Sequence, residues 1–177
     1  KNLWLKWKQG YGFVSQSSTT DSRAAHIKKD PYRLEKTSWA VQGYHYDWSG
    51  RTYSTEMNSH IASCLAKLSV KLASIVPQAP VDFIPEAVIC NYYGSNTVAM
   101  GGHVDDAEYA LECPVVSISL GRKPCIFLVG TSTRDDPAMP VLLRPGDVVW
   151  LHGCSRRAVH SMARLLNAYH VQRSQKD

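Results

Sequence analysis

The chain has 177 residues, of which 44% are apolar and 20% are charged, and its net charge is +5. This composition suffices for one folded domain, with or without an extension, and excludes a mainly disordered chain. No apolar run approaches the roughly 20 residues of a membrane-spanning helix, so we expect no membrane partner, whereas the mild positive charge permits a polyanionic one.

The first 38 residues are polar and irregular, with a Ser/Thr cluster at 15–22 and a basic stretch at 26–29. We therefore predict a basic, irregular N-terminal extension over residues 1–38 and a single domain over residues 39–177. The basic residues form either a solvated face or a surface that follows a phosphate backbone. Residues 1–13 lack a clean apolar segment, so we do not expect a signal peptide.

Residues 39–56 have the pattern of a β-hairpin. Trp39–Tyr46 is rich in strand-forming residues, and the sequence Asp-Trp-Ser-Gly then indicates a turn into Thr52 and Tyr53. The aromatic residues predict either a packed hairpin face or a lid that stacks on a substrate base.

Residues 59–76 are predicted to form a supporting helix. Apolar residues recur at spacings of three and four, which places them on one helical face. They are Ile61, Leu65, Leu68, Leu72 and Ile75. Ser59 is a suitable N-cap, and Pro77 is expected to end the helix.

After Pro85 the sequence consists of short strand-like runs separated by Gly, Pro, Asn or Asp. The gaps are too short for the helices of a parallel βαβ sheet, so the pattern favours a sandwich or a jelly roll. The runs are 87–93, 115–120, 125–129, 141–143, 147–151, 158–160 and 167–172.

One short motif has the residue types of a metal site. His103 and Asp105 are two residues apart, so on a strand both side chains leave the same face. His160 closes a later strand-like run, and two histidines with one carboxylate form the facial triad of non-haem Fe(II) oxygenases. The preceding Gly101-Gly102 pair suggests a close backbone approach. A lone His-x-Asp is a weak signal, because this spacing often arises by chance.

The surrounding motifs make the signal specific. Over about residues 31–173 the chain resembles the AlkB family of Fe(II)- and 2-oxoglutarate-dependent dioxygenases, and most of all the eukaryotic AlkB homologue 1 branch. The matching motifs, in chain order, are Asn91/Tyr93, His103/Asp105, Ser117/Ser119/Gly121, Gly146/Asp147/Val148/Val149 and Ser155/Arg156/His160. The resemblance implies a mainly β fold with flanking helices around a double-stranded β-helix (jelly-roll) core at 86–173.

The resemblance also implies the cofactors and their ligands. His103, Asp105 and His160 match the catalytic residues that bind Fe(II), and 2-oxoglutarate and O2 complete the reaction. Asn91 and Tyr93 match contacts to 2-oxoglutarate. The family ends in an Arg-x-Asn-x-x-x-Arg strand that holds the carboxylates of 2-oxoglutarate. Here the intervals between Arg164, Asn167 and Arg173 are longer, so both arginines remain candidates.

The implied activity is oxidative demethylation of N-methylated bases in RNA, tRNA or unpaired DNA, with release of formaldehyde. The implied partner is nucleic acid with an unpaired or flipped methylated base, and we expect a monomer. Candidate substrate contacts are Trp39, Tyr44, Tyr46, Tyr53 and Arg134. Two alternatives stay open: the same oxygenase chemistry on a protein or small molecule, and an inactive jelly-roll binding module.

The cysteines bear on the compartment. The chain has 5 of them, none in a Cys-x-x-Cys pair, and several lie in apolar runs. We predict buried free thiols and hence an intracellular, reducing compartment.

Overall fold

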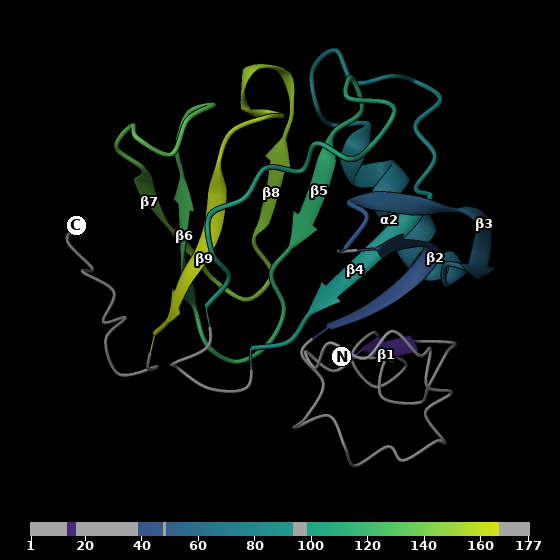
Figure 1. Cartoon of the computed structure of the whole chain (residues 1–177), viewed down its shortest axis with the longest axis horizontal. Coiled ribbons are helices and arrows are strands. Elements are labelled where there is room, and N and C mark those ends of the chain that lie inside the picture. Colours follow the sequence, from purple (N-terminus) through teal and green to yellow (C-terminus); the bar gives the residue numbers. More distant parts are fainter. Residues whose placement is uncertain (1–13, 17–38, 48, 94–98, 167–177) are drawn as a thin grey trace, which may run out of the picture. The chain divides into compact units, whose positions relative to one another are not determined.

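The computed structural model describes residues 14–16, 39–47, 49–93 and 99–166 (Figure 1). The chain divides into two compact units. The first runs to Lys71 and includes Ile84–Tyr92, and the second consists of Leu72–Phe83 and the chain from Tyr93 onward. These divisions do not coincide with the predicted boundary between residues 38 and 39, which stays a prediction.

The first unit contains a four-stranded antiparallel sheet around strand β2 (Trp39–Asp47). Its partners are β1 (Val14–Gln16), β3 (Thr52–Ser59) and β4 (Ala87–Asn91). The predicted hairpin is therefore confirmed as β2 and β3. The half of β2 from Ala40 to Gly43 is buried, because it is paired on both edges. Residues 40–43 of β2 thus belong to the core of the sheet.

Gly43 pairs with Ala87 at the start of β4. Its φ of 83° is in the left-handed region, and a Cβ at this position would lie 2.0 Å from the Glu86 carbonyl oxygen. The backbone N–H of Tyr44 donates to the same oxygen at 3.0 Å. Only glycine combines this φ with so close an approach, so the sheet requires it here.

Helix α2 (Ser63–Ala73) confirms the predicted supporting helix but is shorter than residues 59–76 at both ends. The predicted N-cap was wrong: Ser59 ends β3, and its hydroxyl accepts a hydrogen bond from β2. At the true start, the Ala62 N–H donates to the Oε1 atom of the buried Gln42 at 3.1 Å. Beyond Ala73, turn hydrogen bonds replace the helical ones before the expected proline is reached.

The second unit contains two antiparallel sheets (Figure 1). One pairs β5 (Val115–Ile118) with β8 (Val148–Leu151), and the other has the order β7 (Met139–Leu143), β6 (Cys125–Val129), β9 (His160–Leu165). The chain leaves the first sheet after β5, forms the β6–β7 hairpin in the second, and returns as β8. This alternation is that of the predicted jelly roll.

The last predicted strands are displaced. We expected strands at 158–160 and 167–172, but β9 starts at His160 and continues to Leu165. The preceding residues belong to a tight turn that follows the short 3-10 helix η2 (Gly153–Ser155), where the Ala158 N–H donates to the Ser155 carbonyl. Residues 167–172 lie outside the described part of the chain.

The Gly-Asp motif of the sequence forms a turn between β7 and β8. Gly146 has a φ of 98°, and the Arg144 N–H donates to the Asp147 carboxylate at 2.7 Å. Ser119 is joined to this turn through its backbone: its N–H donates to the Asp147 carbonyl, and its carbonyl accepts from the Gly146 N–H. Ser119, Gly146 and Asp147, which belong to two of the family motifs, thus stabilise this turn through hydrogen bonds.

The cysteines are free, as predicted, but their expected burial is wrong for Cys154, which is exposed; the other four are half-buried. Among the described residues, no helix has the length and apolar character needed to cross a membrane.

Candidate metal centre

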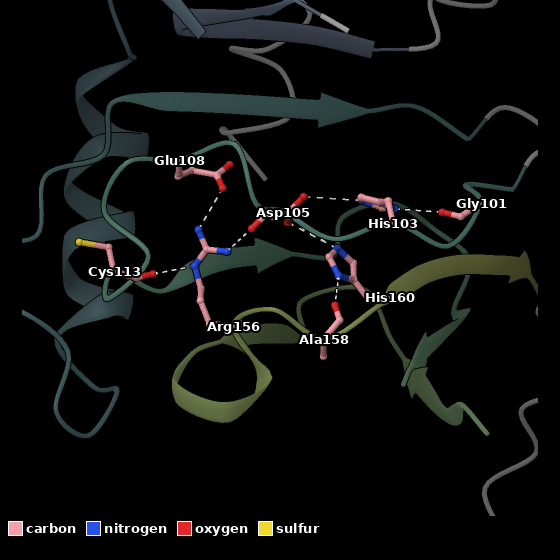
Figure 2. A network of polar contacts seen from close by, with 8 residues as sticks. All are labelled: Gly101, His103, Asp105, Glu108, Cys113, Arg156, Ala158 and His160. Atoms are coloured by element: carbon pink, nitrogen blue, oxygen red, sulfur yellow. Dashed lines mark hydrogen bonds and ion pairs between the residues drawn. The ribbon is translucent and has the colours of Figure 1, made fainter. Parts of the chain in front are cut away.

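His103, Asp105 and His160 converge in the second unit, and each offers one ligand atom within 4.8 Å of the others. The Nε2 atom of His103 lies 3.7 Å from Asp105 Oδ1, and the Nε2 atom of His160 lies 3.4 Å from Asp105 Oδ2. Figure 2 shows both imidazoles directed at the one carboxylate. The structure thus brings together the three residues that the sequence predicts as metal ligands.

The backbone brings the two histidines side by side. The N–H of each donates to the carbonyl of the other, at 3.0 Å from His103 and 2.9 Å from His160. This bridge attaches the segment around His103 to the start of β9. The ring centroids lie 4.4 Å apart, so β pairing fixes a distance that the sequence separation does not reveal.

The outer ring nitrogens leave the inner ones available for a metal ion. His103 Nδ1 lies 2.9 Å from the Gly101 carbonyl oxygen, and His160 Nδ1 lies 3.0 Å from that of Ala158. A carbonyl only accepts, so each Nδ1 carries a proton, and in the neutral ring each Nε2 keeps its lone pair. This tautomer allows histidine to bind a metal through Nε2. The three residues therefore fit Fe(II).

Gly101 contributes its carbonyl to this arrangement but not the expected close approach. A Cβ there would meet nothing within 4 Å, and one at Gly102 would meet only Val159 at ordinary contact distance, 3.4 Å. The structure shows no steric need for glycine at either position.

The electrostatics of the centre keep the carboxylate ionised. Burial would by itself raise the pKa of Asp105. While the histidines are protonated, the hydrogen bond from His160 and the positive charges of His160, His103 and Arg156 outweigh burial and lower the pKa; a bound cation would take the place of the Nε2 protons. Asp105 is therefore charged at neutral pH and ready to bind a cation.

The centre is closed on one side and open on the other. The His160 side chain is only 8% exposed and lies against Phe127, with ring centroids 5.7 Å apart. The side chains of His103 and Asp105 are 30% and 28% exposed. Small molecules would therefore have access to an ion bound here from the His103 and Asp105 side.

The predicted 2-oxoglutarate contacts are only partly described. Asn91 ends β4 in the first unit, whereas Tyr93 is half-buried in the second. Arg164 is exposed on β9, beyond a bulge at Ala163 that interrupts the alternation of side chains after His160. Asn167 and Arg173 lie outside the described residues.

The predicted substrate contacts lie on strands β2 and β3 and in the loop between β6 and β7. Tyr46 and Tyr53 are cross-strand partners in the hairpin, with ring centroids 5.1 Å apart. Tyr44 pairs with Met57, and Trp39 pairs with Asn91. Arg134 is exposed in the loop between β6 and β7. These positions fit a packed aromatic face, and their role toward a substrate stays a prediction.

Sequence reasoning missed a buried arginine next to Asp105 and the acidic partner of that arginine. Arg156 is 3% exposed, and it contacts Asp105, Glu108 and Cys113. The Ser-Arg pair ahead of His160 was the one sequence signal, and it carried no role. Glu108 gave no signal, because an acidic residue after a metal ligand is usually a solvated surface charge.

Comparisons with known proteins agree with this geometry. Residues 3–176 match the family described as the 2OG-Fe(II) oxygenase superfamily. The chain is 38% identical over 161 residues to the DNA N(6)-methyladenine demethylase ALKBH1A of Arabidopsis thaliana, covering 90% of this chain and 46% of that protein. It is 32% identical over 160 residues to the human nucleic acid dioxygenase ALKBH1, covering 90% of this chain and 39% of that protein.

The chain thus spans less than half the length of these two curated relatives. Among solved structures it is similar to OsALKBH1, with a TM-score of 0.61 and 24% identity over 72% of this chain and 66% of that one. This similarity supports the jelly-roll fold.

Proposed function

Because this chain belongs to the 2OG-Fe(II) oxygenase superfamily, we propose that it removes methyl groups oxidatively from N-methylated bases in nucleic acid. The observation that carries the proposal is the convergence of two Nε2 atoms on the Asp105 carboxylate. The names of the relatives, a DNA demethylase and a nucleic acid dioxygenase, support the substrate class.

His103, Asp105 and His160 would hold the Fe(II) ion. When Fe(II), 2-oxoglutarate and O2 are bound, this chemistry couples decarboxylation of 2-oxoglutarate to hydroxylation of a substrate C–H bond. On an N-methyl group, hydroxylation is followed by loss of formaldehyde and leaves the unmethylated base. The task of the protein is to orient the metal ligands and to position the methyl group.

The carboxylates of 2-oxoglutarate require a guanidinium partner, because arginine stays charged and binds a carboxylate bidentately. Arg164 is exposed on the strand that begins with the ligand His160, which supports its candidacy. Arg173, Asn91, Asn167 and Tyr93 remain proposed contacts on the strength of the family motifs.

For the substrate, we propose that the exposed part of the hairpin and the Arg134 loop contact the nucleic acid. Tyr44, Tyr46 and Tyr53 are all half-buried and so retain ring surface for stacking on a base. Trp39 is likewise half-buried, and Arg134 offers a cation to a phosphate.

The test is mass spectrometry of N-methylated DNA and RNA oligonucleotides after incubation with the protein, Fe(II) and 2-oxoglutarate. We expect the oligonucleotide to lose one methyl group, with formation of equal amounts of formaldehyde and succinate. With the Asp105→Ala variant we expect the oligonucleotide to keep its methyl group. Turnover of 2-oxoglutarate without demethylation of any oligonucleotide would favour a protein or small-molecule substrate. No turnover at all would favour an inactive binding module.

We also propose that the protein works as a monomer in a reducing intracellular compartment. The free cysteines support the compartment, since exposed Cys154 would be prone to oxidation elsewhere.

A further inference from the structure

Arg156 is a buried cation and is not one of the three candidate metal ligands. Its side chain is 4% exposed, and it lies between η2 and the ligand His160, four residues before that histidine. A buried guanidinium must have its hydrogen bonds and its charge satisfied, so its partners show what it holds in place.

All three partners lie on one segment, residues 105–113 (Figure 2). Arg156 Nη1 donates to the backbone carbonyl of Asp105. Arg156 Nε donates to the Cys113 carbonyl at 2.9 Å, and Arg156 Nη2 donates to Glu108 Oε2 at 3.0 Å. One rigid fork therefore fixes the start, the middle and the end of this segment.

We propose that Arg156 is a positioning residue of the metal centre, which acts with Glu108 to hold Asp105 in the orientation that meets both histidines. The inference rests on the metal site of the proposed function and is independent of the identity of the substrate.

The connectivity gives the reason. Asp105 lies on residues 99–113, which form no strand; the one β-bridge in this stretch joins His103 to His160. Without a strand to fix it, the Asp105 backbone depends on side-chain anchors. Arg156 supplies one from the chain segment that also carries His160, so two ligands from distant parts of the sequence share a support.

Glu108 makes this support stable. Its carboxylate neutralises the buried guanidinium, and a hydrogen-bonded charge pair is stronger than a neutral one. Removal of a residue that orients a metal ligand through a hydrogen bond typically weakens metal binding by about 10–100-fold. A residue that served only the stability of the fold would leave the affinity of the folded protein unchanged.

The experiment measures Mn(II) affinity of the metal-free protein by electron paramagnetic resonance, together with hydrogen exchange of the 105–113 amides and thermal unfolding. The variants are Arg156→Met, Arg156→Lys and Glu108→Gln. Arg157→Met is the matched control, because it removes the same charge from the adjacent, exposed position. Wild-type Mn(II) binding first establishes the metal site itself, so failure of that premise is seen separately.

We expect folded Arg156→Met to bind Mn(II) about tenfold or more weakly and to exchange the 105–113 amides faster. Arg156→Lys keeps the charge but cannot reach three acceptors, so it should not restore wild-type affinity. Glu108→Gln should weaken binding about threefold, since it retains an acceptor without the charge. Arg157→Met should match wild type.

Wild-type Mn(II) affinity in folded Arg156→Met would overturn the proposal. If that variant does not fold, the decision falls to the other two: wild-type affinity in both Arg156→Lys and Glu108→Gln would show that the fork does not position Asp105.

Discussion

Asp105 is the residue on which both imidazoles of the centre converge, at 3.4 and 3.7 Å. We predict that Asp105→Ala loses more than the roughly 100-fold in metal affinity that removal of an outer support costs, because it deletes a ligand and the only negative charge of the triad. Its side chain is 28% exposed, so the fold should survive. Mn(II) titration and far-ultraviolet circular dichroism measure the two effects.

The exposed neighbour Asp106 provides the control for this prediction. Asp106→Ala removes one carboxylate from the same segment and should leave metal affinity near that of the wild type. Equal losses in the two variants would mean that the total charge of the segment, and not the position of Asp105, decides binding.

Cys90 and Cys154 have contrasting thiol environments: Cys90 is half-buried and Cys154 is exposed. Burial raises the pKa of the Cys90 thiol to about 12, although a hydrogen bond with Tyr92 partly offsets this. The thiolate is the nucleophile, so near pH 8.5 almost none of Cys90 is reactive, and its reactivity should rise only as pH approaches the raised pKa. Cys154 is exposed. Iodoacetamide should therefore alkylate Cys154 well before Cys90 in the native protein, as read by peptide mass spectrometry.

In denaturant both thiols become accessible and should react at similar rates. Native labelling of Cys90 as fast as Cys154 at pH 8.5 would contradict the burial of Cys90 in the first unit.

The candidate metal ligands were predictable from the sequence because few residue types bind Fe(II) and the surrounding family motifs singled them out. The strand expected at His103 and Asp105 is absent: His103 forms only an isolated bridge, so the two-residue spacing did not by itself place both side chains on one face. The Arg156 network was not predictable in this way. Two of its three acceptors are backbone carbonyls, which every residue carries, so no pattern of side chains marks them.

At the scale of the elements, β2 depends on Gly43. Gly43→Ala places a methyl group 2.0 Å from the Glu86 carbonyl oxygen at a φ of 83°. Left-handed backbone costs a residue with a Cβ about 1–2 kcal/mol, and overpacking adds about 1–3 kcal/mol. We therefore predict a loss of about 3 kcal/mol in the free energy of unfolding, measured by urea denaturation.

Gly146 separates the two contributions. Its φ is 98°, but a Cβ there would meet nothing within 4 Å. Gly146→Ala should thus show only the backbone cost, about 1–2 kcal/mol. If both variants lose the same amount, the close approach of β2 to the Glu86 carbonyl contributes nothing to the requirement for glycine.

Elements with a clear period were predicted well, and their ends were not. The apolar spacing around Leu65 is a property of the helix itself, so α2 was found. Its start was misplaced because Ser59 has the residue type of an N-cap, whereas its hydroxyl is used by the N–H of Gly43 in the adjacent strand. The capping of Ala62 by Gln42 depends on the sheet and leaves no local pattern.

At the scale of the whole molecule, the net charge bears on the proposed action on nucleic acid. A charge of +5 spread over 177 residues gives modest attraction to a phosphate backbone. Opening a duplex to extract a base costs a few kcal/mol in lost pairing and stacking. Under the proposed function, the aromatic side chains of the hairpin would hold an extracted base, whereas so modest a charge would offset little of the cost of extraction. The proposal therefore favours bases that are already unpaired.

We therefore predict that one methylated oligonucleotide reacts at least about tenfold faster, in kcat/KM, as a single strand or bulge than as a perfect duplex. Tyr53→Ala and Trp39→Ala should raise the KM for the single strand by removing stacking surface, whereas Met57→Ala, an exposed non-aromatic change on the same strand as Tyr53, should not. Decarboxylation of 2-oxoglutarate without substrate should stay unchanged in all three variants, because none alters His103, Asp105 or His160. A preference for the perfect duplex would refute the unpaired-base hypothesis, and an equal KM in the aromatic variants would leave the hairpin as a packed face of the sheet.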